Sequence, residues 1–312
     1  MKSFDSSVYD LRQVVIASTR YKPKAHPVVH EFAHTLEALN IDVRLDLEGS
    51  AQLTELARDA DMVMAVGGDG TILSTARRLA GVSIPTLGVN MGKLGFLAEH
   101  SISDVQAFLA GDKRGSWHLN PKMMLEVTLQ NGHGTSTCYA LNDVTVSQGV
   151  MTRLIGIDMS VDGHHATQYR SDGLIISTPV GSTAYSLSVG GPILGQGLRA
   201  MIVTPIAPHA LTNRPIVIEG GSSLTFRIDN PADELALVID GQARLELHQG
   251  DYFTVAAAET DFMLIASDKH NYFDILRTKL AWGTVPVRPN PEGDMYQVEA
   301  RAEMADSSQE TD

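Results

Sequence analysis

A run of glycines around one aspartate has the residue types and spacing of a phosphate-binding turn. The Gly-Gly-Asp-Gly-Thr run at residues 67–71 follows an apolar segment at 62–66 and precedes a segment at 72–79 with apolar positions at helical spacing. Glycines at such a strand-to-helix turn let phosphate oxygens approach the N–H groups at the helix N-terminus. Phosphates repel Asp69 there, so its presence indicates a metal ion or a proton transfer. A glycine-rich turn with a purely structural role is the alternative.

Two common nucleotide-binding motifs do not match this region. A Walker A loop requires Ser or Thr after Gly92-Lys93, where the chain has Leu94. A Rossmann fingerprint beginning at Gly68 requires glycine at position 73, which is leucine. The expected nucleotide site is therefore Rossmann-like without the Gly-x-Gly-x-x-Gly fingerprint.

A second stretch, at residues 170–192, carries hydroxyl groups suited to a sugar or an amide. Arg170 and Asp172 precede an apolar strand. The following turn, at residues 181–188, presents four hydroxyl side chains and the ring of Tyr185. Hydroxyls and backbone amides pair with ribose and amide groups, and the tyrosine ring can face a base or close a pocket. The Gly-x-Ser-x-Gly spacing of a serine hydrolase is missing, and a structural turn stays an alternative.

These stretches require a scaffold, and residues 1–119 predict an α/β domain. Short apolar segments alternate with amphipathic ones, which is the pattern of βαβ units with a parallel sheet. The strands are expected at residues 13–18, 41–46, 62–66 and 84–90, and the helices at 27–40, 51–59 and 72–79. Ligands bind beyond the carboxyl ends of such strands, where residues 67–70 and 90–95 would lie together.

Residues 120–268 differ, because they consist of short β-prone segments separated by Gly, Asn, Asp and Pro. This pattern predicts an all-β domain. The Asp240-Gly241 pair in it is typical of a hairpin turn, with Gln242 beside it in reach of a ligand. A helix is expected within residues 269–284, returning to the first domain, and residues 285–312 form an acidic tail with the composition of a disordered segment.

The composition limits the classes of function. The formal charge of −13 and the lack of a basic stripe argue against a nucleic-acid partner. No apolar run approaches the roughly 18–20 residues of a membrane span, and no amphipathic basic helix suggests a lipid surface. Cys138 is the only cysteine, and the N-terminus has no signal-peptide pattern, so a cytoplasmic protein is expected.

The motifs together resemble the ATP-dependent NAD kinases over residues 12–283. The Gly-Gly-Asp-Gly run alone is shared with phosphofructokinases and diacylglycerol-type lipid kinases, whereas the segment at 172–192 is not. The further matches, in the same order as in the family, are at residues 88–97, Asn142-Asp143, Pro208-His209, Arg214-Pro215 and 279–282. The resemblance implies that the second domain is a β-rich sandwich. It also implies a homodimer or homotetramer whose sites are completed by a neighbouring subunit.

The resemblance implies transfer of the γ-phosphate of ATP to the 2′-hydroxyl of the adenosine ribose of NAD, giving NADP. Asp69 would be the general base for this hydroxyl, as carboxylates are in other kinases, and would touch the substrate together with Gly70. Mg²⁺ or another divalent ion would offset the phosphate charge near Asp69. The glycines that would hold phosphates are Gly67, Gly68 and Gly70.

Further positions would contact the dinucleotide. Asn142 and Asp143 match the family's Asn-acid pair, which holds the adenosine part of NAD, although Asp143 is one methylene shorter than the frequent Glu. Arg153 and Gln242 align with family contacts by spacing alone. The positions in the second stretch that match dinucleotide contacts are Arg170, Asp172, Thr183, Ala184, Tyr185, Ser186, Leu187 and Ser188.

Two other classes of function stay as alternatives. One is a lipid or sugar kinase that uses the same turn on another hydroxyl, and the other is a non-catalytic sensor of NAD or NADP. The second stretch disfavours a sugar kinase, and the intact Asp69 disfavours a sensor. The use of NADH or polyphosphate, inhibition by NADPH or NADH, the metal ligands and the size of the oligomer stay open.

Overall fold

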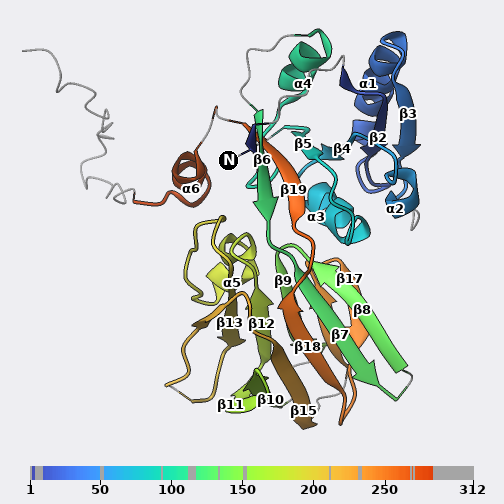
Figure 1. The fold of residues 1–312 in the computed structure, drawn as a ribbon. Coiled ribbons are helices and arrows are strands. Elements are labelled where there is room, and N and C mark those ends of the chain that lie inside the picture. Colours follow the sequence, from blue (N-terminus) through green and yellow to red (C-terminus); the bar gives the residue numbers. More distant parts are fainter. Residues whose placement is uncertain are drawn as a thin grey trace, which may run out of the picture. The chain divides into compact units, whose positions relative to one another are not determined.

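The computed structural model describes residues 2–3, 10–49, 53–92, 94–111, 117–132, 134–149, 153–210, 212–230, 234–267, 269 and 271–283. It divides into two compact units, Met1–Asn271 and Tyr272–Asp312, each of which is described by itself. The first unit holds an α/β lobe (the described residues among 2–3, 10–122 and 262–267) and a β lobe (those among 123–257), which can be followed in Figure 1. The predicted fold class, an α/β part with a parallel sheet and a β-rich part, is confirmed.

The α/β lobe is built on a seven-stranded sheet with the order β1-β6-β19-β5-β4-β2-β3. The run from β19 to β3 is parallel, whereas β6 is antiparallel to both β19 and β1. The strands are β1 (Lys2–Ser3), β2 (Gln13–Ala17), β3 (Asp42–Asp46), β4 (Met62–Gly67), β5 (Thr86–Asn90), β6 (Trp117–Lys122) and β19 (Phe262–Ser267). The helices are η2 (Pro23–Ala25), α1 (His26–Ala38), α2 (Leu53–Leu56), α3 (Asp69–Arg78) and α4 (Ile102–Leu109).

Both faces of this sheet are covered, as strand β4 illustrates, since all its residues are buried. Met62, Met64 and Val66 pack in one apolar cluster with side chains of α1 and α4. Val63 and Ala65 pack in a second cluster with side chains of α2 and α3. Such alternation between two buried faces is typical of a parallel sheet between helical layers. The start of α3 consequently lies at the carboxyl end of β4.

The β lobe is a sandwich of two six-stranded antiparallel sheets, with the orders β11-β10-β15-β18-β7-β8 and β14-β13-β12-β9-β16-β17. An apolar cluster between the sheets draws buried side chains from both, such as Val127 and Phe226 from the first sheet and Val146 and Ile176 from the second. The strands of the first sheet are β7 (Leu125–Asn131), β8 (Gly134–Ala140), β10 (Ile155–Val161), β11 (His164–Ser171), β15 (Leu224–Asn230) and β18 (Tyr252–Ala257). Those of the second are β9 (Asp143–Gln148), β12 (Gly173–Ser177), β13 (Ala200–Ile206), β14 (Ile216–Glu219), β16 (Leu235–Ile239) and β17 (Ala243–Glu246). The short helices η3 (Gly181–Thr183) and α5 (Tyr185–Ser188) follow β12.

The chain passes from β6 into the β lobe through β7 and returns from β18 through β19. β19, at residues 262–267, pairs in parallel with β5, although sequence order groups it with the β-rich segments. The domain boundaries expected from the sequence stay predictions. The two lobes are thus joined by two neighbouring strands, β6 and β19, which pair with each other.

The second unit contains helix α6 (Tyr272–Leu280), at the place where a helix was expected. The predicted return of this helix to the first domain stays a prediction. The acidic tail at residues 285–312 lies outside the described residues. Among the described helices, none combines the length and the apolar character needed to span a membrane.

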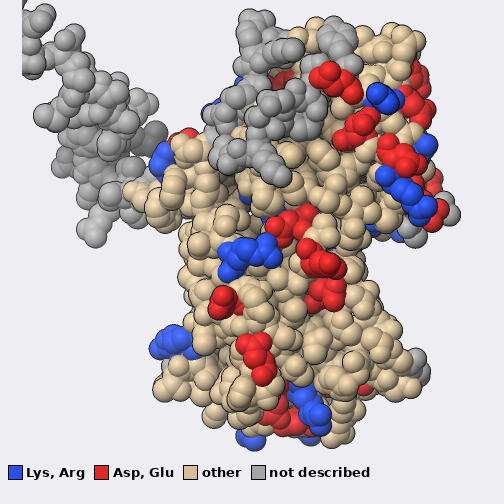
Figure 2. All heavy atoms as spheres, in the orientation of Figure 1, with Lys and Arg blue, Asp and Glu red and all other residues tan. Residues whose placement is uncertain are grey.

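Charged side chains are interspersed on the face drawn in Figure 2, where acidic and basic groups lie next to one another on both lobes. Among the described residues, some charged side chains form ion pairs, such as Arg199 with Asp261 at 2.9 Å. Charge on the described part of this face is therefore mixed, although the whole chain carries a formal charge of −13.

Candidate active site

Asp69 opens helix α3, after the buried strand β4 and Gly68. Its half-buried carboxylate accepts three backbone hydrogen bonds: Oδ2 from the N–H of Phe96 at 2.9 Å, and Oδ1 from those of Leu97 at 3.1 Å and Ala98 at 2.9 Å. These charge-assisted bonds fix the orientation of the carboxylate. They also tie the start of α3 to the loop at residues 94–98.

Glycines are required where this loop and α3 approach other groups closely. A Cβ at Gly95 would lie 2.0 Å from Asp69 Oδ1, and a Cβ at Gly67 would lie 2.1 Å from Thr71 Oγ1. A Cβ at Gly68, by contrast, would meet no described atom within 4 Å. Gly67 therefore has a packing role, whereas the backbone at Gly68 borders open space at the N-terminus of α3.

Asp240 lies in the turn between β16 and β17, and its carboxylate also accepts three backbone hydrogen bonds. Oδ1 accepts from the N–H groups of Asn142 at 2.8 Å and Asp143 at 3.1 Å, and Oδ2 accepts from that of Leu141 at 3.2 Å. The backbone N–H of Asp240 donates in turn to the carbonyl of Asp143 at 2.9 Å. The predicted hairpin turn is confirmed by the pairing of β16 with β17, and it fixes the turn at residues 141–143.

Asp143 is buried beside the carboxylate of Asp240. Burial, and next the Asp240 charge, raise the pKa of Asp143 to about 7, while the Thr145 hydroxyl, 3.3 Å from Asp143 Oδ1, acts in the opposite direction. Burial raises the pKa of Asp240 too, but the three N–H groups and Arg77 oppose this shift. Asp143 is therefore the member of the pair that takes up a proton first. As an acid it can donate a hydrogen bond, and as a carboxylate it can only accept.

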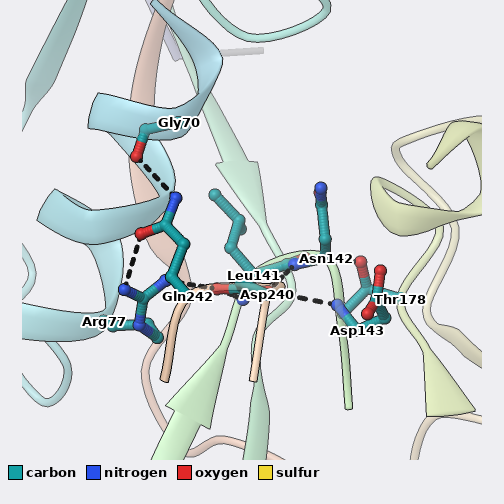
Figure 3. Close-up of polar contacts among 8 residues, drawn as sticks. All are labelled: Gly70, Arg77, Leu141, Asn142, Asp143, Thr178, Asp240 and Gln242. Carbon is teal, nitrogen blue, oxygen red and sulfur yellow. Dashed lines mark hydrogen bonds and ion pairs between the residues drawn. The ribbon is translucent and has the colours of Figure 1, made fainter. Parts of the chain in front are cut away.

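Arg77 and Gln242 connect this turn with helix α3 (Figure 3). Arg77 Nη1 lies 3.1 Å from Asp240 Oδ2, and Arg77 Nη2 donates to Gln242 Oε1 at 2.7 Å. Gln242 Nε2 donates to the carbonyl of Gly70 at 2.9 Å. The side chain of Asp240 is fully buried and that of Arg77 is 15% exposed. The predicted contact residue Gln242 is thus held against the first turn of α3.

The second stretch packs directly on the Asn142 turn. The N–H of Thr178 donates to the carbonyl of Asn142 at 2.9 Å, and the Thr178 hydroxyl donates to the carbonyl of Leu141 at 2.6 Å. A Cβ at Gly181 would lie 2.0 Å from the Asn142 carbonyl oxygen, so only glycine allows this approach. The turn at residues 181–188 and the Asn142-Asp143 pair, which the sequence separates, therefore form one surface.

The other predicted contact residues differ in exposure. Tyr185, Ser188, Arg170 and Arg153 are exposed, and Asp172, Thr183, Ala184 and Leu187 are half-buried. Ser186 is buried, and its Oγ lies 2.9 Å from Thr204 Oγ1, so its hydroxyl is engaged inside the protein. Among the described residues, no hydrogen bond or ion pair joins Arg153 to the other members of the site. Arg77 and Asp240 are the members that sequence reasoning missed, since it treated them as parts of a helix and of a turn.

Two family models match the chain. The ATP-NAD kinase N-terminal domain matches residues 14–111, and the ATP-NAD kinase C-terminal domain matches residues 141–267. Curated relatives include an NAD kinase of Geobacter metallireducens, 38% identical over 281 residues that cover 88% of this chain and 99% of the relative. The NAD kinase of Trichlorobacter lovleyi is 40% identical over 283 residues, with the same coverage of each chain.

Solved structures agree with these matches. An NAD kinase from Archaeoglobus fulgidus in complex with ATP superposes with a TM-score of 0.67 at 26% identity, covering 86% of this chain and 98% of that one. Yeast NADH kinase complexed with NADH superposes with a TM-score of 0.78 at 22% identity, covering 88% of this chain and 89% of that one, which shows the fold alone. The resemblance found in the sequence is confirmed: the chain belongs to the ATP-NAD kinase family.

Proposed function

We propose that Asp69 is the general base of the NAD kinase reaction. Its carboxylate takes the proton of the adenosine 2′-hydroxyl of NAD as that oxygen bonds to the γ-phosphorus of ATP, and the bond from phosphorus to the β-phosphate oxygen breaks. The products are NADP and ADP. A carboxylate offers about four lone-pair directions, and the N–H groups at residues 96–98 occupy three of them. One direction remains for a hydroxyl, and this fixed orientation is the observation that carries the proposal.

The N-terminus of α3 is the proposed site for the phosphates of ATP. Free backbone N–H groups and the positive end of the helix dipole attract phosphate oxygens. The open space beside Gly68 and the exposure of Gly70 support this assignment. For Gly67, the contact with Thr71 supports a role in shaping the turn.

A divalent ion, Mg²⁺ in the first instance, is proposed to enter with ATP. The described residues contain no group of three His, Cys, Asp or Glu side chains that could hold a metal. This donor set fits an ion held largely by phosphate oxygens and water, with one carboxylate nearby, which is the usual setting for Mg²⁺. When bound, the ion offsets the phosphate charge that would otherwise repel Asp69.

The adenosine part of NAD is assigned to the surface formed by Asn142, Asp143 and the turn at residues 181–188. The close packing of Gly181 on Asn142 supports one continuous binding surface. Tyr185, 46% exposed, offers its ring to a base. The remaining proposed contacts are Arg153, Arg170, Asp172, Thr183, Ala184, Leu187, Ser188 and Gln242, while Ser186 is assigned to the support of the turn.

We also propose that the protein is a homodimer or homotetramer in the cytoplasm. The family resemblance motivates the oligomer, and the single cysteine in 312 residues favours a reducing compartment. Light scattering during dilution, combined with activity at each concentration, tests the first point. A specific activity that stays constant while the protein dissociates to monomers would remove the need for a neighbouring subunit.

The activity is tested by incubating the purified chain with ATP, Mg²⁺ and NAD. We expect NADP and ADP in equal amounts, with a 2′-phosphate identified by phosphorus NMR, and no turnover when a chelator removes the divalent ion. A sugar or lipid kinase would instead form ADP only when a hexose or diacylglycerol replaces NAD as the acceptor. A sensor would bind NAD with no release of ADP. Either result would contradict the proposed reaction.

A further inference from the structure

Helix α3 is held at two points by the hairpin turn after β16. Gln242 Nε2 donates to the carbonyl of Gly70 at 2.9 Å, next to Asp69. Two turns further along the helix, Arg77 donates to Asp240 at 3.1 Å and to Gln242 at 2.7 Å. The hairpin and α3 belong to different lobes, so these bonds fix the start of α3 relative to the β lobe.

The same hairpin also holds the turn that is assigned to NAD. The Asp240 carboxylate that contacts Arg77 accepts from the N–H groups of residues 141–143 at 2.8 to 3.2 Å. A short path of side chains therefore leads from Gly70 through Gln242, Arg77 and Asp240 to Asn142, as Figure 3 shows. Each link of this path is a hydrogen bond or an ion pair.

We propose that Arg77 and Asp240 are positioning residues of the kinase, which align the phosphate-binding end of α3 with the NAD-binding turn at residues 141–143. The inference rests on the proposed roles of Asp69 and Asn142-Asp143. Arg77 acts through Gln242 and Asp240, and contact with a substrate is not required. Phosphoryl transfer depends mostly on positioning and electrostatics, and a displacement of about 1 Å can cost on the order of 10²-fold in rate.

The neighbouring ion pair on α3 provides a matched control. Arg78 is also 15% exposed, and it pairs with the buried carboxylate of Asp46. Asp46 is the last residue of β3, so this pair stays within the α/β lobe. A buried ion pair is weak evidence for stability, but losing one partner leaves the other charge buried. Both pairs therefore predict a loss of stability, and only the pair of Arg77 predicts a loss of alignment.

The experiment compares the variants Arg77→Met and Arg78→Met in the full chain. For Arg77→Met we expect kcat to fall about 10- to 100-fold, with the KM for ATP within about threefold of the parent, because the ATP site itself stays intact. For Arg78→Met we expect kcat within about threefold of the parent. The loss of thermal midpoint should be similar in Arg77→Met and Arg78→Met. Equal kcat losses in the two variants, or a kcat within about threefold of the parent for Arg77→Met, would overturn the inference.

A conservative variant keeps the inference testable if Arg77→Met does not fold. Arg77→Lys retains a charge for Asp240 but lacks the planar fork that reaches Gln242 as well, so an intermediate kcat is expected. The parent kcat in Arg77→Lys would overturn the role of the fork in alignment.

Hydrogen exchange separates this inference from the proposed reaction. If the parent chain forms no NADP, the proposed reaction is contradicted. The alignment is tested independently, by the exchange rates of backbone amides. Arg77→Met should accelerate exchange both at the start of α3 and at residues 141–143, and Arg78→Met at neither. Unchanged exchange at both places in Arg77→Met would contradict the alignment, whatever the activity.

Discussion

Two Asp-Gly turns of this chain hold their carboxylates in the same way and differ in their surroundings. The carboxylate of Asp69 accepts from three consecutive N–H groups at residues 96–98, and that of Asp240 accepts from three at residues 141–143. Asp240 is buried and paired with Arg77. Asp69 is half-buried, and among the described residues no basic side chain forms an ion pair with it.

This difference in surroundings indicates which carboxylate is available for chemistry. Around the carboxylate of Asp240, the guanidinium of Arg77 and the three N–H groups leave little room for another partner. This carboxylate therefore holds two parts of the site together. In Asp69, a similar set of N–H groups orients the carboxylate while one lone-pair direction remains for a substrate. One hydrogen-bonding arrangement thus serves positioning in one turn and, as we propose, proton transfer in the other.

The largest effect on stability is expected at the buried turn. In Asp240→Asn, the amide oxygen can still accept from Asn142 and Asp143, but the amide nitrogen faces two donors, Arg77 and the N–H of Leu141. We expect a loss of about 3–5 kcal/mol in the free energy of unfolding, measured by calorimetry, because a buried charge loses its partner.

The control for this variant is Asp61→Asn, since exposed Asp61 accepts two backbone hydrogen bonds, from Arg12 at 2.7 Å and Gln13 at 2.9 Å. An exposed site should lose about 1 kcal/mol or less. Equal losses in the two variants would contradict the importance of burial and pairing at Asp240.

The next prediction concerns kcat. A large fall in kcat is expected when the N–H donors are displaced from Asp69 while its carboxylate is kept. A Cβ at Gly95 would lie 2.0 Å from Asp69 Oδ1, so Gly95→Ala must displace the loop or the carboxylate. We expect kcat to fall about 10- to 100-fold, as a misplaced base predicts. Gly92→Ala, three positions earlier in the chain, is the control, because a Cβ there meets no described atom within 4 Å. The two variants should differ clearly in kcat, and similar values would show that the loop does not orient Asp69.

A pH dependence is expected at the buried turn, because the pKa of Asp143 is raised to about 7 from its ordinary value of 3.8. Between these values the folded chain retains a proton that the unfolded chain has lost, so stability falls as the pH rises through this window. Asp143→Asn should remove this loss of stability. The thermal midpoint of the variant, measured at each pH, should therefore rise relative to that of the parent between pH 5 and pH 8. His100, whose pKa burial lowers to about 4, acts in the opposite direction and cancels in the difference between the two proteins. A difference that does not change with pH would contradict the shift.

The smallest effect on stability is expected at Gly68, whose extended φ of 166° suits any residue. A Cβ there meets no described atom within 4 Å, so Gly68→Ala should fold with nearly the parent's thermal midpoint. We expect the KM for ATP to rise about 3- to 10-fold, because the methyl group enters the space assigned to phosphate. An unchanged KM for ATP would place the phosphates elsewhere.

Local signals in the sequence predicted much of the site. The apolar strand, the glycine turn and the amphipathic helix at residues 62–79 are adjacent in the chain, and the structure contains them as β4 and α3. The helix starts at Asp69 rather than at residue 72, because glycine at 68 and 70 hides the first turn from a propensity argument. The helix expected at 51–59 is described only as Leu53–Leu56.

Contacts between distant residues could not be predicted in this way. Arg77 and Asp240 are 163 positions apart, and each has an ordinary local explanation as a helix residue or a turn residue. Asp69 and its donors at residues 96–98 are 27 to 29 positions apart, and the glycine at 95 acquires its meaning only when the loop lies on the carboxylate. The return of β19 to the first sheet likewise follows from pairing with β5 rather than from its own residues.

The most direct test of the difference between the two turns is the single-turnover rate of NADP formation by Asp69→Asn beside Asp240→Asn, at saturating ATP, Mg²⁺ and NAD. In Asp69→Asn the amide oxygen can still accept hydrogen bonds from the N–H groups of Leu97 and Ala98, whereas the N–H group of Phe96 loses its acceptor. We predict a rate lower by about 10²- to 10⁴-fold, the range for a positioned acid-base group, with a smaller loss of thermal midpoint than in Asp240→Asn. A folded Asp69→Asn protein that forms NADP within a few-fold of the parent rate would contradict the assignment of Asp69 as the base.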